Sequence, residues 1–234
     1  MADILLNGLS FHESWGGSAL QYLIRPDAKV VILPLSGNDG YSSDARQWEA
    51  CFTRGRKQYE ALVRPFRSFG IHDDQISMIN YYSDDEDSAS RKIGSADIVY
   101  LVGRNPVWMM QRLEDLHITD LISSFGGTLI GNAAGAMIMM ENFTAYHDGI
   151  RRYEKGLARQ GGFRLDLTFD QTEQGIYRLI HLLETEDTPV VVLSGRCGAV
   201  IDGTHFDLLG DGMLLGPEDL DMLYDTVKGS EHLG

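Results

Sequence analysis

Short apolar runs alternate with longer amphipathic segments along most of this chain. Nearly continuous apolar runs occupy residues 29–35 (KVVILPL), 97–102 (DIVYLV) and 188–193 (TPVVVL), and a weaker run covers 76–81. Runs of this length and composition are typical of strands that are buried on both faces of a parallel sheet. The alternation therefore predicts an α/β protein, with helices on both faces of a mostly parallel sheet.

Helical periodicity fills the segments between these runs. After a polar loop at 36–43, apolar residues recur at helical spacing from Trp48 to Phe66, and Gly70 is expected to end that helix. Asn105 and Pro106 suit the cap and the first position of another helix. Residues 173–184 predict a further helix.

Two later segments predict strands of a different kind. Residues 163–169 alternate between apolar and polar, which places Arg164, Asp166 and Thr168 on one face. Residues 199–216 contain short apolar runs broken by glycines, and this pattern predicts antiparallel strands at an edge of the sheet.

The segment with most chemical information is 127–140, GTLIGNAAGAMIMM. A short apolar strand enters the turn Gly131-Asn132-Ala133-Ala134-Gly135, and an apolar helix follows. This strand–turn–helix pattern is the setting of a G-x-S-x-G nucleophile elbow, in which glycines allow a turn too sharp for side chains. Ala133 stands at the nucleophile position, and its methyl group cannot attack a carbonyl carbon.

Composition limits the partners of the protein. The 234 residues suit one α/β domain covering 1–234, with 43% hydrophobic and 23% charged residues. A formal net charge of −14 argues against nucleic acid and anionic membranes as partners. The first ten residues lack the basic and apolar segments of a secretion signal, and Cys51 and Cys197 form no spaced framework, so we expect a cytoplasmic protein.

Four motifs in order resemble one enzyme family. They are IVYLVGRN (98–105), GNAAGAM (131–137), FRLDLTFD (163–170) and PVVVLSGRCGAVIDG (189–203). This series is similar to the dipeptidase E family of serine peptidases, which includes the cyanophycinases, over about residues 29–216. The resemblance implies a three-layer fold like that of class I glutamine amidotransferases, and cleavage of dipeptides with an N-terminal aspartate.

The resemblance also assigns positions. It puts the family's serine at Ala133, its histidine at Thr168 and, less directly, its acidic residue at Arg196. The oxyanion-hole amides would be those of Gly103 and Ala134, with Arg104 replacing a loop glycine before Asn105. Serine hydrolysis needs a nucleophile, a base and a group that orients the base, so these replacements predict a protein that does not hydrolyse peptides. Two separate replacements favour natural loss of the site over an engineered one.

Other interpretations stay open at this stage. Arg104, Arg164 and Arg196 either converge on the elbow to bind a small anion or acidic dipeptide, or are surface residues that balance an acidic protein. An active hydrolase would need another route, through Cys197 or Ser194 as a substitute nucleophile or through a water activated by Asp166. The third alternative is a structural or assembly role with no ligand, and the sequence does not indicate the oligomeric state.

The sequence supports neither a metal nor a cofactor. Residues 83–87 (SDDED) could bind a cation, but carboxylates before a helix more often favour its first turn. The histidines show no zinc-binding spacing, and no glycine-rich nucleotide motif lies between a strand and a helix. The seven histidines are His12, His72, His117, His147, His181, His205 and His232.

Overall fold

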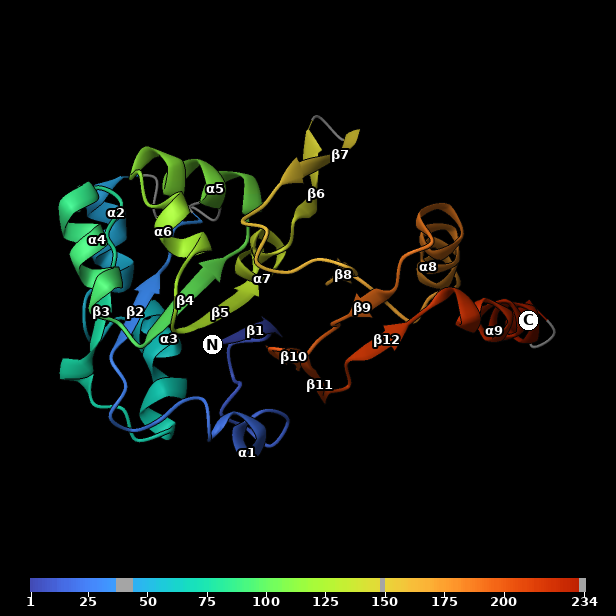
Figure 1. Cartoon of the computed structure of the whole chain (residues 1–234), viewed down its shortest axis with the longest axis horizontal. Helices are drawn as coiled ribbons and strands as arrows, with labels where there is room; N and C mark the ends of the chain where they lie inside the picture. The colour runs from blue at the N-terminus through green and yellow to red at the C-terminus, as the bar shows by residue number, and fades with distance from the viewer. Residues whose placement is uncertain (37–43, 148–149, 232–234) are drawn as a thin grey trace.

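A seven-stranded sheet forms the centre of the protein, as a computed structural model shows for residues 1–36, 44–147 and 150–231 (Figure 1). Five strands are parallel, and β10 and β11 extend the sheet on one side as antiparallel strands. The strands lie in the order β11 (His205–Gly210), β10 (Cys197–Asp202), β1 (Ala2–Asn7), β5 (Thr128–Ala133), β4 (Ile98–Gly103), β2 (Val30–Leu33) and β3 (Ile76–Met78).

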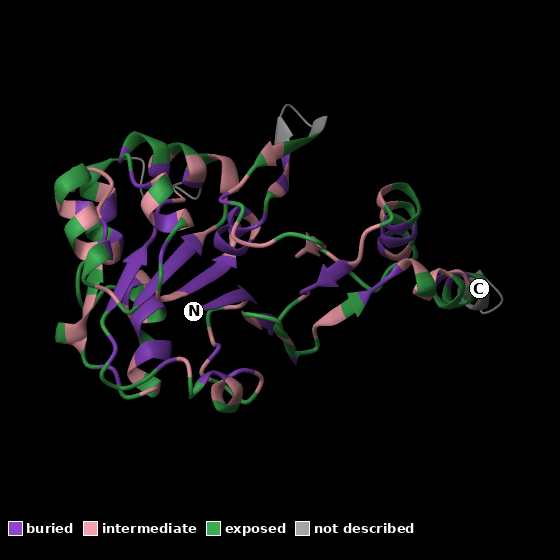
Figure 2. Ribbon diagram, viewed as in Figure 1, coloured by how far each residue is buried: buried purple, intermediate pink, exposed green. Residues whose placement is uncertain are grey.

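Helices cover both faces of this sheet, so the architecture has three layers (Figure 1). Along β4, Val99 and Leu101 belong to one apolar cluster, and Tyr100 and Val102 belong to the other. The inner strands β1, β5, β4 and β2 are almost entirely buried, whereas the edge strands β3 and β11 are half-buried or exposed (Figure 2). The first face carries α4 (Glu86–Gly94), α5 (Pro106–Asp115), α6 (Thr119–Ser123) and α7 (Ala134–Met139), and the second carries α1 (Gly17–Leu20) and α3 (Lys57–Ser68).

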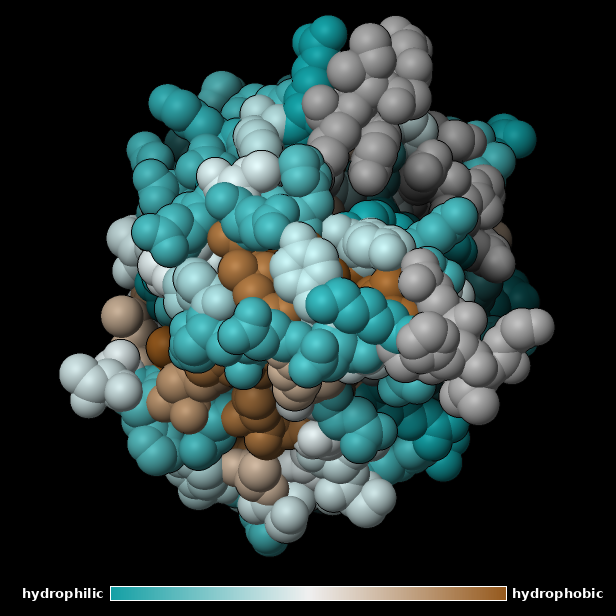
Figure 3. Space-filling model, turned by 90° about the vertical axis from the view of Figure 1, so that its right-hand side faces the viewer, coloured by the Kyte–Doolittle hydropathy of each residue, from teal (hydrophilic) through white to brown (hydrophobic). Residues whose placement is uncertain are grey.

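The later part of the chain forms a smaller lobe beside the central sheet (Figure 1). Its three-stranded sheet has the order β12 (Met213–Leu215), β9 (Val190–Val192), β8 (Arg164–Asp166), and packs on α8 (Glu173–Glu186) and α9 (Leu220–Glu231) around its own apolar cluster. Apolar surface is visible when the molecule is viewed from this side (Figure 3). Exposed apolar side chains of the lobe include Tyr177, Leu214 and Met222.

A hairpin and two short 3₁₀ segments complete the described chain. Strands β6 (Asn142–His147) and β7 (Ile150–Lys155) pair antiparallel and project from the central body (Figure 1). The 3₁₀ segments are η1 (Asp73–Gln75) and η2 (Pro217–Asp219). No described helix has the length and apolar character required to cross a membrane.

The structure departs from the sequence prediction in the first helical region. The stretch expected to be one helix is two, α2 (Ala45–Phe52) and α3, with Gly55 between them at φ +85°. Gly70, at φ +89°, follows the end of α3 as predicted. Most of the polar loop expected at 36–43 lies outside the described residues, since only Ser36 is described.

Strand β1 was not predicted, because a charged residue interrupts its apolar run. Asp3 is only 4% exposed, and its carboxylate accepts hydrogen bonds from the side chains of Arg159 (Nη2 to Oδ1, 2.6 Å) and Gln160 (2.6 Å). Arg159 also donates to the carbonyl oxygens of Ser123 and Phe125. A charge can be buried when it is paired in this way, and its partner lies 156 residues away in the sequence.

Candidate functional site

The turn between β5 and α7, where the sequence predicts a nucleophile elbow, is sharp and strained. The strand ends at Ala133 and the helix begins at Ala134, with no loop between them. Ala133 has φ 52° and ψ −112°, a region that residues other than glycine rarely adopt. Such strain persists only where the surrounding structure enforces it. Ala133 therefore lies between a central strand and a helix, as the sequence predicts.

Two glycines allow the helix to lie directly on the sheet. A Cβ atom added to Gly135 would lie 2.1 Å from the carbonyl oxygen of Leu101 on the neighbouring strand. A Cβ added to Gly131 would lie 2.5 Å from Sδ of Met139 and 2.6 Å from the backbone of Gly135. These are far below normal contact distances, so both positions require glycine.

Asn132 fixes the turn from within the core. Its side chain is 3% exposed, and its Nδ2 donates to the carbonyl oxygen of Gly8 (2.9 Å) and to the hydroxyl of Tyr100 (3.0 Å). The amide of Gly8 donates to Oδ1 of Asn132 (3.4 Å). Burial raises the pKa of Tyr100, so its hydroxyl stays protonated as part of this network. The end of β5 is thereby tied to β4 and to the chain that follows β1.

The loop after β4 lies beside the elbow and is organised by a serine. Gly103 is directly opposite Ala133 in the parallel register. The hydroxyl oxygen of Ser36 accepts hydrogen bonds from the amides of Arg104 (2.7 Å) and Asn105 (2.6 Å). Asn105 caps α5 as predicted, because its Oδ1 accepts from the amide of Trp108 (3.0 Å). The sequence analysis missed Ser36, although its place just after a central parallel strand was a usable signal.

Thr168 follows the end of β8. Oδ1 of Asp166 accepts hydrogen bonds from both the amide (2.7 Å) and the hydroxyl (2.9 Å) of Thr168. Both residues line a cavity of about 150 Å³ together with Met137, which lies on α7 one turn after the elbow. The structure therefore brings Thr168 to the elbow helix. It also holds the Thr168 hydroxyl on a carboxylate.

Asn7, which the sequence analysis also did not single out, connects the small sheet to the central one. Nδ2 of Asn7, at the end of β1, donates to the carbonyl oxygens of Leu167 (3.1 Å) and Leu193 (2.6 Å). These two residues follow the ends of β8 and β9. The segment that carries Thr168 is thus held against the carboxyl end of the central sheet.

The three arginines considered for an anion site have different environments. Arg164 pairs with Glu186 on α8, and its guanidinium lies 5.0 Å from the ring centroid of Tyr153. Arg196, with a side chain 74% exposed, pairs with Glu13 (3.2 Å). Both have acidic partners, which favours the surface interpretation for them. Arg104 is also engaged in interactions, and it lines a pocket beside Gly103.

Comparison with known proteins identifies the family. The model of Peptidase family S51 matches residues 49–168, which are 120 of the 234 residues and include the whole elbow. The chain belongs to peptidase family S51. The dipeptidase E resemblance of the sequence is therefore confirmed.

Solved structures show that this S51 chain has the fold of peptidase E. A putative peptidase E from Listeria monocytogenes EGD-e matches with a TM-score of 0.58 at 16% identity, covering 89% of this chain and 98% of that one. A peptidase from an acI-B1 Actinobacterium matches with the same TM-score at 14% identity, covering 92% and 93%. A comparison with curated proteins found no significant match.

Cys197, the substitute nucleophile considered for this S51 protein, is a buried thiol. It lies at the start of β10 opposite Asn7, is fully buried, and its Sγ is 3.4 Å from the carbonyl oxygen of Ser194. Burial, and then the charge of Asp211, raise the pKa of Cys197 from 9.0 to about 11. The side chain is therefore a protonated thiol at neutral pH, which is a poor nucleophile.

The acidic run at 83–87 caps and stabilises the start of α4. Asp85 is the N-cap of α4, and its Oδ1 accepts from the amide of Ser88 (2.8 Å). Asp84 accepts from Nζ of Lys92 (2.6 Å) and from the amide of Asn80 (2.8 Å). Burial opposes ionisation of Asp84, but these hydrogen bonds outweigh it and lower its pKa. Within the described residues, no group of three or more histidine, cysteine or acidic side chains is placed to hold a metal ion.

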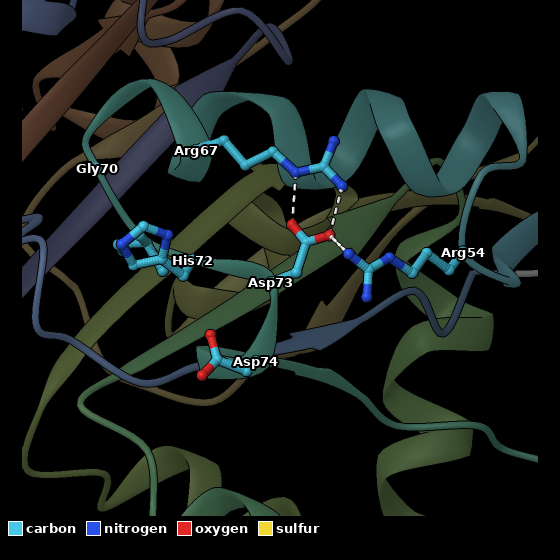
Figure 4. A pocket seen from close by; sticks show the side chains of 7 residues that line it. Arg54, Arg67, Gly70, His72, Asp73 and Asp74 are labelled. Carbon is cyan, nitrogen blue, oxygen red and sulfur yellow. Dashed lines mark hydrogen bonds and ion pairs between the residues drawn. The ribbon is translucent and has the colours of Figure 1, made fainter.

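An open pocket of about 560 Å³ is lined by residues near the end of α3 and in the segment that leads to β3 (Figure 4). Arg67 binds Asp73 through two hydrogen bonds, Nε to Oδ1 (2.6 Å) and Nη2 to Oδ2 (2.9 Å), and also binds Glu60. Arg54 binds the same Asp73 carboxylate (2.5 Å). These charges satisfy one another, and Arg67 holds the pKa of Asp73 below its ordinary value. The charged residues of this pocket are best explained as an ion-pair network that joins α3 to η1.

Proposed function

We propose that this member of peptidase family S51 binds a small anionic or peptide-like ligand at the elbow and does not hydrolyse peptides. One observation carries the proposal: Ala133 has the strained φ of 52° that an elbow imposes, yet its side chain is a methyl group. The turn is maintained at a cost in backbone strain. A turn kept in this form without its reacting atom fits a binding role.

The lack of a base supports the same conclusion. Thr168 stands where the family resemblance places a histidine, and a threonine hydroxyl cannot accept a proton at neutral pH. Its hydroxyl already donates to Asp166. Removing one member of such a catalytic unit removes most of the rate, and here both the nucleophile and the base are replaced.

The ligand is proposed from the charge beside the turn. Gly103 pairs with Ala133, and Arg104 follows Gly103 directly, so a guanidinium is carried on the loop next to the elbow. A carboxylate held there would form charge-assisted hydrogen bonds, worth about 1.5–3 kcal/mol each. The two buried, unpaired cysteines, Cys51 and Cys197, fit the cytoplasmic setting that we propose for this protein.

Calorimetric titration tests the binding proposal. Succinate and an acidic dipeptide should bind at millimolar concentration in low salt, and added salt should weaken the binding. Arg104→Ala should weaken it about tenfold or more, whereas Arg25→Ala should not, because Arg25 is exposed and pairs with Asp27 (3.1 Å) on another part of the surface. Equal binding by the Arg104 and Arg25 variants, or no binding at all, would leave the structural role as the better account.

Activity measurements test the hydrolytic alternatives. The purified protein should neither cleave aspartyl dipeptides nor react with a fluorophosphonate. Turnover that is lost on Cys197→Ala, or on Asp166→Asn, would instead establish the thiol or the activated-water route.

The state of Cys197 has its own test. Below pH 9 its thiol is protonated in both the folded and the unfolded chain and contributes nothing to the pH dependence of stability. Between pH 9 and about 11 the unfolded chain loses this proton while the folded chain keeps it, so the free energy of unfolding should fall as pH rises. Denaturant unfolding across this range should show a steeper fall for the wild type than for Cys197→Ala. If the free energy of unfolding fell equally with pH in both proteins, the Cys197 thiol would not be protected from deprotonation in the folded chain.

A further inference from the structure

An apolar pocket of about 160 Å³ lies beside the elbow, on the α3 face of the central sheet. Its walls come from the carboxyl ends of β2 and β4, from α2 and α3, and from the chain that follows β1. The lining residues are Leu9, Pro34, Ser36, Phe52, Gln58, Ala61, Leu62, Val102, Gly103 and Arg104.

The pocket lining is apolar except for a few groups, and these mainly donate hydrogen bonds. Ser36 already accepts from two backbone amides, so the two acceptor positions of its oxygen are used and its own hydrogen is left to donate. Arg104 has only donors and a permanent positive charge, and Gln58 adds an amide. This set of groups complements a carboxylate and not an ammonium group.

The position of the pocket connects it to the elbow. Gly103 lines the pocket and lies opposite Ala133 in the register of β4 and β5. An acidic group bound beside Gly103 and Arg104 would therefore lie at the rim of the pocket and next to the turn. Any part of the same molecule that extends toward α3 would meet Leu62 and Phe52.

We infer that the ligand is a small carboxylate with one branched alkyl or phenyl group, and that this group occupies the pocket. The inference rests on the proposed anion binding at the elbow and adds the chemistry of the ligand's other end. The volume is similar to that of the apolar cavity of roughly 150 Å³ that takes up benzene, which sets the size of the group. An acidic dipeptide with two charged side chains has no apolar group that could pack against the apolar walls of the pocket.

A series of carboxylates tests the inference by calorimetric titration. Acetate, propionate, butyrate, 4-methylpentanoate and 3-phenylpropionate carry the same charge and increasingly large apolar groups. Affinity should rise roughly fourfold for each methylene that is buried, and then level off when the pocket is full. The primary amide of 3-phenylpropionate should bind much more weakly, because it lacks the charge.

Variants of the pocket wall separate this inference from the elbow proposal. Ala61 is exposed on α3 and lines the pocket, so Ala61→Phe should fill the space and abolish the dependence on chain length while acetate still binds. Ser68→Phe places the same side chain at an exposed position of α3 outside the pocket, and should bind like the wild type. Leu9→Ala, which removes a wall without filling the space, should also reduce the dependence on chain length.

Each outcome decides between the two proposals. Equal affinity for acetate and 3-phenylpropionate in the wild type would overturn the inference and leave anion binding intact. A chain-length dependence that survives both Ala61→Phe and Leu9→Ala would place the apolar group elsewhere and would also overturn it. Failure of every carboxylate to bind would overturn the elbow proposal and the inference together.

Discussion

The carboxyl ends of β5 and β8 carry the two positions that the family resemblance assigns to a serine and a histidine, and they are built differently. At β5, backbone atoms of three elements approach so closely that Gly131 and Gly135 cannot carry a side chain. At β8, Thr168 is exposed and is held mainly by the Asp166 side chain. The backbone geometry of the elbow is fixed by core packing and therefore by folding. The reactivity at Ala133 and Thr168 depends instead on which side chains stand there, and folding does not require a particular one.

The largest expected effect concerns Gly135. Gly135→Ala would place a Cβ 2.1 Å from the carbonyl oxygen of Leu101, so α7 must move off the sheet, at a cost of about 3 kcal/mol in the free energy of unfolding. Denaturant unfolding measures it. Gly94→Ala is the matched control, because nothing lies within 4 Å of its Cβ position, and it should be neutral or slightly stabilising. Similar losses for both variants would mean that close contact does not define the elbow.

A smaller effect is expected for the buried network below the turn. Asn132→Leu keeps the volume but leaves the Tyr100 hydroxyl and the backbone of Gly8 without their partner, at a cost of about 1–3 kcal/mol. Combining it with Tyr100→Phe should cost less than the sum of the two single changes, because one orphaned hydroxyl is then removed. Strict additivity in a double-mutant cycle would show that the two side chains do not depend on one another.

At β8 the corresponding change should have little consequence. Thr168→Val removes one exposed hydrogen bond to Asp166 and keeps the shape, so the free energy of unfolding should fall by less than about 1 kcal/mol. Thermal unfolding of Thr168→Val and Gly135→Ala under the same conditions compares the two losses of stability directly. If Thr168→Val lowered the free energy of unfolding as much as Gly135→Ala, the ends of β5 and β8 would not differ in their importance for folding.

The smallest expected effect is on activity. Ala133→Ser should fold normally and should not hydrolyse aspartyl dipeptides, because a serine hydroxyl needs an adjacent base. Adding Thr168→His should give at most a trace of turnover, detected as a slow release of free aspartate. Robust hydrolysis by the single variant would show that a base already exists elsewhere and that Thr168 is the wrong position.

The sequence predicted those parts of the fold whose signals are local. The apolar runs at 29–35, 76–81 and 97–102 predicted the central parallel strands β2, β3 and β4, the glycine spacing predicted the sharp turn between β5 and α7, and Asn105 predicted the start of α5. The run at 188–193 is also a buried strand, β9, but it belongs to the small three-stranded sheet. The missed features depend on partners far along the chain. Strand β1 was hidden because the charge of Asp3 is paired only by a residue 156 positions later.

The candidate site follows the same division. Gly103 and Ala134 could be placed beside the turn from their motifs, because a strand end and a helix start fix a backbone. The place of Ser36 after a central strand is visible in the sequence, but its contacts with the amides of Arg104 and Asn105 depend on two strand ends meeting. The partners of Arg164 and Arg196 were likewise unpredictable, because Glu186 and Glu13 lie on other elements.

The place of β1 in the sheet sets the order in which the protein can be completed. This strand is the first along the chain, yet it lies between residues 128–133 and residues 197–202. During synthesis β1 must wait for both neighbours, so it cannot be paired on both sides until residue 202 has left the ribosome. Pairings of such long sequence separation form slowly. Until then the unpaired edges of β1 present free backbone N–H and C=O groups, which other nascent chains can pair with.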